Sequence, residues 1–189
     1  MLTRAVAAWL LVTLAAVGPQ TNEARITPDD VAVIDVALTA ASLTRLTEFF
    51  RGAPLPPLLL RSRTAAVCDS VPKPGTFCID HYAKTLRENL DLKPNVWPKA
   101  FYEAVIERNR ASLDLSGMSF ASATLTAPDM ISAYKEGKAL AHVSRPTYFD
   151  NRAIVFVSTS YAWGTTQAVL IEKRAGKWEP VAVETLGRS

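Results

Sequence analysis

Apolar residues recur every three to four positions in the segment that starts at Thr27, which is the spacing of an amphipathic helix. Thr27 can cap the first turn, and Pro28 suits the first helical position. Asp29 and Asp30 then favour the positive N-terminal end of the helix dipole. The pattern predicts one long helix, or two helices joined near residues 39–42. Its apolar positions are Val31, Ile34, Leu38, Ala41, Leu46, Phe49 and Phe50.

Two shorter helices are predicted in the middle of the chain, over residues 79–90 and in a segment that Pro98 opens. In the second segment Glu103 and Glu107 lie four residues apart and have basic neighbours within reach. This arrangement indicates a solvated helix face rather than a pair of catalytic carboxylates. The apolar face of this helix is Phe101, Tyr102, Val105 and Ile106.

The C-terminal third of the chain is rich in strand patterns. Residues 153–157 and 168–171 are almost entirely apolar, which predicts central strands covered on both faces. Gly176 supplies the positive φ of a hairpin turn, and Pro180 indicates that the returning strand lies at an edge. Further strands are predicted over residues 58–67, with Arg61 and Arg63 on one face, and over 120–126 and 140–144.

These patterns predict an α+β fold, with N-terminal helices followed by a C-terminal antiparallel β-meander packed against a helix. A chain of 189 residues with 49% hydrophobic and 21% charged residues has the size and composition of one globular domain. The net charge of +3 is too small to indicate nucleic acid as a partner.

The first 20 residues have the pattern of a signal peptide. Arg4 is followed by thirteen uncharged apolar residues, 5–17, whereas a membrane-spanning helix needs about 20. We expect cleavage between residues 15 and 24, which leaves 21–189 as a single α+β domain without a stable membrane anchor. The expected location is periplasmic or secreted. The alternative is a buried N-terminal core helix.

Cys68 and Cys78 are the only cysteines, and an exported chain with two cysteines favours a disulfide. Closing this eleven-residue ring should stabilise the fold by about 2.5–3 kcal/mol. Two more specific interpretations of these cysteines, a nucleophile with its base and a zinc site, have less support. Cys78 and His81 are too close in sequence for a well-oriented nucleophile and base, and the spacing of Cys68, Cys78 and His81 is not typical of a zinc site.

Asp69, Asp80 and His81 flank the cysteine loop and are the one place where carboxylates, an imidazole and a constraining bridge come together. Such a group can perform acid–base chemistry, but a solvated polar loop is the simpler interpretation. The other histidine, His142, alternates within a short predicted strand and is expected to be a satisfied sheet residue.

Tyr161 and Trp163 form an aromatic cluster in the predicted turn between the two central strands. Exposed aromatic side chains often anchor interfaces, which makes these residues a candidate ligand or partner patch. Alternatively, Trp163 folds back over the sheet as part of the core.

Three segments resemble a loose group of exported bacterial proteins that have no established activity. They are residues 108–112 (RNRAS), 144–156 (SRPTYFDNRAIVF) and 170–178 (LIEKRAGKW). The resemblance implies export and a C-terminal antiparallel sheet with a Gly-x-Trp hairpin, and it implies no catalytic residue. Many members have a turn rich in cysteine and glycine between the central strands, where this chain has residues 161–166 (YAWGTT) without cysteine.

The sequence contains no phosphate loop, dinucleotide fingerprint, zinc-protease motif, nucleophile elbow or EF-hand loop. We therefore assign no catalytic residue, metal or cofactor. The sequence favours a non-catalytic domain that binds a protein or a small ligand, of which an immunity or inhibitor protein is a special case. The alternative is a cell-envelope hydrolase that works through Asp69, Asp80 and His81.

Overall fold

The computed structural model describes residues 25–50, 56–68, 77–90, 101–126, 130–161 and 164–188, with the backbone alone at 43–50, 87, 89–90, 101 and 130. The predicted signal peptide lies outside these residues. None of the described helices is long and apolar enough to cross a membrane.

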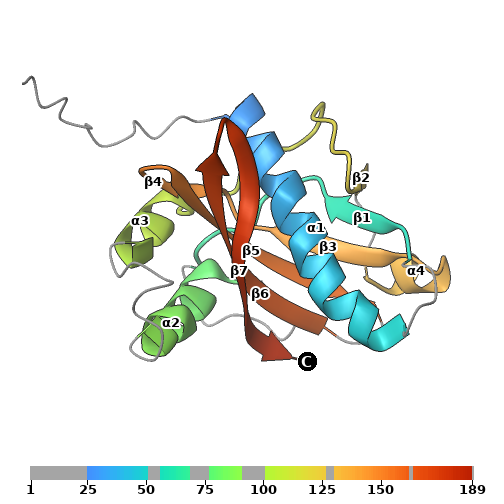
Figure 1. The fold of residues 1–189 in the computed structure, drawn as a ribbon. Coiled ribbons are helices and arrows are strands. Elements are labelled where there is room, and N and C mark those ends of the chain that lie inside the picture. Colours follow the sequence, from blue (N-terminus) through green and yellow to red (C-terminus); the bar gives the residue numbers. More distant parts are fainter. Residues whose placement is uncertain are drawn as a thin grey trace, which may run out of the picture.

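Helices and strands are interspersed as far as α4 along the described chain, and the five elements after α4 are all strands (Figure 1). The helices are α1 (Pro28–Phe50), α2 (Ile79–Leu90), α3 (Phe101–Arg108) and α4 (Met130–Lys135). The strands are β1 (Leu58–Arg61), β2 (Thr124–Thr126), β3 (Ala139–Val143), β4 (Thr147–Phe149), β5 (Arg152–Ser160), β6 (Gly164–Arg174) and β7 (Lys177–Arg188).

These strands form one sheet in the order β2-β1-β3-β5-β6-β7, and β4 also pairs with β5. The pairs of β5 with β6 and of β6 with β7 are antiparallel, so the C-terminal meander is present. The α+β class is confirmed, but the predicted order is only partly correct. β1 lies between α1 and α2 in the chain and pairs in parallel with both β2 and β3. The sheet is therefore mixed.

The α1 helix begins where the sequence predicts and continues as a single helix through residues 39–42. At its first turn Thr27 Oγ1 accepts a hydrogen bond from the Asp30 amide at 3.1 Å. The Asp30 carboxylate accepts one in return from the Thr27 amide at 2.9 Å. This reciprocal cap satisfies two amide groups that the helix leaves without a partner.

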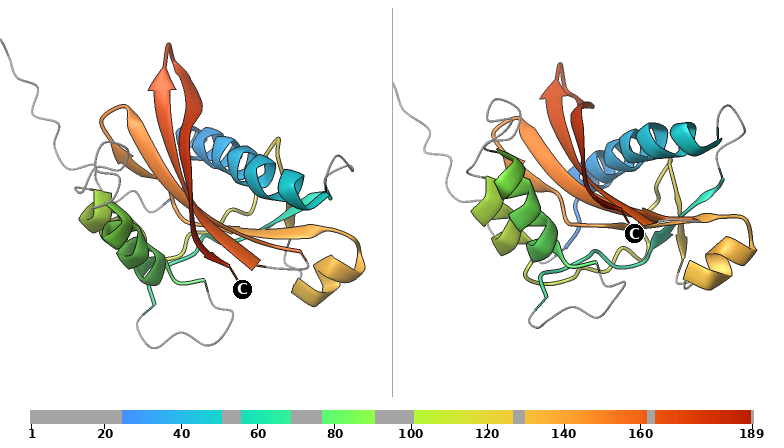
Figure 2. Two further views of the ribbon diagram at one scale, coloured as in Figure 1. Left: turned by 60° about the horizontal axis from the view of Figure 1, so that its bottom comes forward. Right: turned by 90° about the horizontal axis from the view of Figure 1, so that it is seen from below.

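Helices cover both faces of the sheet, which confirms the prediction of central strands buried on both sides (Figure 2). Val155 and Val169 pack with the buried side of α1, for example with Ile34. Successive strand residues point to opposite faces, so Phe156 and Leu170 face away from α1 and pack with residues of α2 and α3.

The hairpin between β6 and β7 has the predicted turn, and β7 lies at the edge of the sheet as predicted. Ala175 and Gly176 connect the strands with φ angles of 48° and 81°, and such positive values suit a two-residue turn. Pro180 lies in β7, the last strand of the sheet, where a missing amide donor is tolerated.

One predicted strand is shorter than expected, and two short elements were missed. The strand predicted over 58–67 ends at Arg61, because the chain then exchanges partners and forms isolated bridges, such as Ala65 with Ser144 and Ala66 with Cys78. The short elements α4 and β4 were not predicted, because six and three residues are too few to show a period.

Candidate functional site

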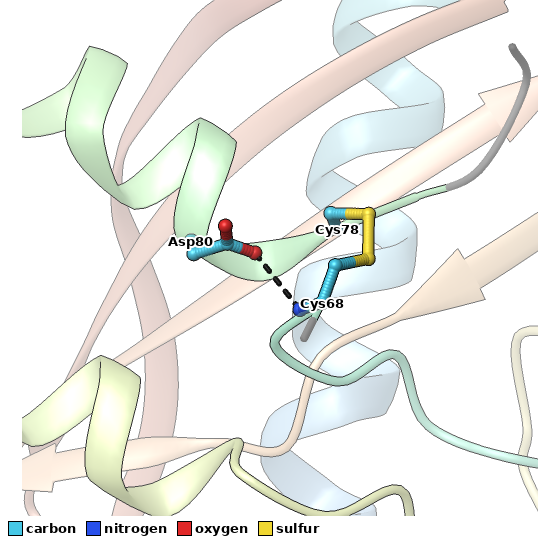
Figure 3. The surroundings of a disulfide bond; sticks show 3 residues. All are labelled: Cys68, Cys78 and Asp80. Atoms are coloured by element: carbon cyan, nitrogen blue, oxygen red, sulfur yellow. Dashed lines mark hydrogen bonds between the residues drawn. A yellow bond between two sulfur atoms is a disulfide. The ribbon is translucent and has the colours of Figure 1, made fainter. Parts of the chain in front are cut away.

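The predicted disulfide is present, and it joins the segment after β1 to the start of α2 (Figure 3). The Cα atoms of Cys68 and Cys78 lie 5.5 Å apart. Next to the bridge, a carboxylate oxygen of Asp80 accepts a hydrogen bond from the Cys68 amide at 3.1 Å. Because both sulfur atoms are bonded to each other, neither is a nucleophile or a zinc ligand.

The structure places two of the three residues of the predicted polar site. Asp80 and His81 are consecutive residues of α2, so their side chains leave the helix in different directions. The exposed imidazole of His81 contacts the ring of Tyr82, with the ring centroids 5.1 Å apart. Asp69 lies outside the described residues, and the hydrolase interpretation remains a prediction.

A row of four polar residues crosses the sheet on the face opposite α1, and we call it the polar row: Arg61, His142, Ser158 and Thr166. His142 pairs with Ser158, which in turn pairs with Thr166 on the next strand. Arg61 is next to His142 because the preceding residues, Leu60 and Ala141, pair with each other. Since Leu60, Ala141 and Val157 pack on the α1 side, the residues that alternate with them face away from α1.

The polar row is partly open to solvent. Arg61 is exposed, His142 and Ser158 are partly buried, and Thr166 is buried. The hydroxyl of Thr166 donates a hydrogen bond to the Ser158 hydroxyl at 3.4 Å. At the β3 end of the row, the ring of Phe77 meets His142 edge-on at 5.4 Å.

Two helix-covered apolar clusters border the polar row on the same face. On one side Phe156, Ala168 and neighbouring residues pack with Ile79 and Ala83 of α2. On the other side Leu59 and Leu140 pack with Ala133 of α4. The polar row is therefore the part of this face that lies between the two helix contacts. Figure 2 shows α2 and α3 at one side of this face and α4 at the other.

His142 is uncharged near neutral pH. Its burial, and secondly the positive charge of Arg61, lower the pKa of His142 to about 4, although hydrogen bonds to the backbone of Thr64 and Arg63 act in the opposite direction. This result agrees with the expectation that His142 is a sheet residue.

Two exposed residues of α4, Ile131 and Tyr134, lie with Tyr161 at the end of β5, and we call these three residues the aromatic patch. The rings of Tyr134 and Tyr161 meet edge-on with centroids 5.6 Å apart. Ile131 is 63% exposed and Tyr134 is 54% exposed. Tyr161 was singled out from the sequence, whereas Ile131 and Tyr134 were missed because α4 was not predicted. Trp163 lies outside the described residues.

A second polar cluster is buried, and the sequence did not indicate it. Asp30, whose side chain is fully buried, accepts a hydrogen bond from the Tyr148 hydroxyl at 2.9 Å. A guanidinium nitrogen of Arg108 lies 3.5 Å from the same carboxylate oxygen. Burial, and secondly the charge of Asp30, raise the pKa of Tyr148 above its usual range. This cluster connects α1, α3 and β4 inside the fold, so we assign it to folding rather than to binding.

The chain matches no family model, no curated protein and no solved structure. The likeness to exported bacterial proteins therefore remains a prediction from the sequence. Any function must be inferred from the polar row, the aromatic patch and their surroundings.

Proposed function

We propose that this protein is an exported, non-catalytic binding domain and that it binds a partner protein through the aromatic patch. The observation that carries the proposal is the exposure of Ile131 and Tyr134 on one short helix, next to the ring of Tyr161. Large apolar and aromatic side chains that stay exposed on a folded domain are enriched at interfaces.

The position of the patch favours a protein partner over a small ligand. Ile131 and Tyr134 are three residues apart on α4, which places them on one side of the helix. Both side chains remain more than half exposed. A small-ligand site buries most of its ligand in a concavity, whereas a protein interface can use protruding side chains of this kind.

Photo-crosslinking in a host that exports the protein tests this function. A photoreactive amino acid in place of Tyr134 should give a discrete adduct with one protein. The same amino acid in place of Val181, which is 42% exposed on β7, is the matched control and should give none. The substitution Ile131→Asp should abolish the adduct, because it places a charge in the centre of the interface.

The proposal is wrong if position 134 gives no protein adduct, or if it gives the same adducts as position 181. Loss of the folded state would not be mistaken for loss of binding, because the Ile131→Asp variant changes an exposed side chain and should keep the unfolding midpoint of the parent.

A further inference from the structure

We propose that the polar row binds the anionic group of a small molecule, a carboxylate or a phosphate ester, between Arg61 and Ser158. This site is separate from the aromatic patch and does not depend on the proposed partner.

Arg61 supplies the positive charge that an anion requires. Its side chain is exposed, and within the described part of the chain no carboxylate forms an ion pair with it. Other arginines are occupied: Arg63 donates to the side chain and the backbone of Ser112, and Arg108 approaches Asp30. Because no described carboxylate pairs with it, the Arg61 guanidinium offers paired donors that match the oxygens of a carboxylate or a phosphate.

Ser158 supplies a hydroxyl donor on the same face of the sheet. Ser158 accepts its hydrogen bond from Thr166, so its own proton is free to point toward a ligand. Ser158 lies two strands from Arg61, which is about 10 Å at the backbone because neighbouring strands are about 4.8 Å apart. An extended arginine side chain covers most of that distance. An anion held between Arg61 and Ser158 can therefore contact both groups.

Aromatic rings border the polar row. Phe77 packs on His142, and the ring of Tyr82 lies 5.3 Å from that of Phe77. At the far end, a side chain in place of Gly187, which pairs with Thr166, would meet the Tyr82 ring at 3.4 Å. Phe77 is buried and supports the Tyr82 ring, which is partly exposed and offers an apolar surface for the rest of the molecule. We therefore expect an anion attached to an apolar or aromatic group.

The chain has only two histidines, so the imidazole signals of His142 can be followed directly by NMR and assigned with His142→Gln. The probes are benzoate and phenyl phosphate, with benzyl alcohol as the uncharged control. Near neutral pH we expect saturable shifts of the His142 signals with one or both anions and none with benzyl alcohol. A preference between the two anions identifies the group that the site accepts.

Two arginine variants decide whether Arg61 is responsible. Arg61→Gln should weaken binding at least about tenfold, because it removes a charge-assisted hydrogen bond. Arg63→Gln is the matched control and should bind as the parent does, since Arg63 is already bonded to Ser112. The Ser158→Ala variant should weaken binding less than Arg61→Gln does.

The proposal is overturned if neither anion shifts the signals, if benzyl alcohol shifts them as benzoate does, or if the two arginine variants bind equally well. Retained dispersion of the other resonances in Arg61→Gln would show that the variant is folded. This result is expected because Arg61 is an exposed side chain at the end of β1.

Discussion

Acid should destabilise this protein through His142, because the surroundings of this side chain lower its pKa in the folded state. The pKa of His142 is about 4 in the folded protein, below its ordinary value of 6.5, so the unfolded chain takes up the proton first. The stability that the uncharged imidazole contributes is therefore present in full above about pH 6.5. It is lost progressively as the pH falls toward about 4, and no further loss from this group occurs below that pH.

The size of the effect follows from the difference between the two pKa values. A difference of one pKa unit corresponds to about 1.36 kcal/mol. A fall in the pKa of His142 from 6.5 to about 4 therefore corresponds to roughly 3 kcal/mol. Because His142 is only partly buried, water screens part of this energy, and we expect about 2 kcal/mol. That is a substantial part of the 5–15 kcal/mol that is typical of a domain.

Urea unfolding of the parent and of His142→Gln at several pH values between about 7.5 and 4 measures this effect. Carboxyl groups titrate in both proteins and largely cancel in the difference. The parent should lose about 2 kcal/mol more than His142→Gln over this range. The variant His81→Gln, which changes the exposed histidine of α2, is the matched control and should follow the parent.

An equal pH dependence in the parent and in His142→Gln would refute the reasoning, since it would mean that His142 titrates alike in the folded and unfolded chains. A parent that gains stability relative to the variant at low pH would contradict even the sign. That outcome would place an acidic group beside the imidazole instead of Arg61.

Two further predictions concern the interior. Arg108→Met should lower the free energy of unfolding by about 3 kcal/mol, because it leaves the buried Asp30 carboxylate without its cation. In urea unfolding, the double variant Asp30→Asn/Arg108→Met should lose less free energy of unfolding than the two single variants lose together. If the two losses simply add, Asp30 and Arg108 do not stabilise each other. Gln167→Met should raise the melting temperature, since both polar atoms of this buried amide have no hydrogen-bond partner and their removal is worth about 1–2 kcal/mol. A lower melting temperature for Gln167→Met would mean that the amide is satisfied in solution.

The division of the sheet into two faces explains why the polar row and the aromatic patch lie on the same side. The long helix α1 packs over strands at the centre and at the β7 edge, and the side chains beneath it are mostly apolar. The opposite face is covered in two separate places, by α2 with α3 and by α4. Short helices on this face leave the polar row between them and the aromatic patch beside α4.

The sequence alone was sufficient for the features that depend on neighbouring residues. The start of α1 was predictable because Thr27 and Pro28 determine a cap and a first turn within a few positions. The turn at Gly176 and the edge position of Pro180 were predictable for the same reason, since each restricts its own backbone. The bridge between Cys68 and Cys78 followed from their being the only pair.

Only the tertiary structure decided the features that join distant segments. The polar row exists because β1 pairs with β3 and β3 with β5 in particular registers, and a shift by one residue would turn Arg61, His142 or Ser158 to the other face. In the same way, Tyr148 meets Asp30 across 118 positions of sequence. Local patterns restrict the backbone near each residue, whereas strand register depends on the burial of the whole sheet. A candidate site built across strands, such as the polar row, therefore becomes visible only in the fold.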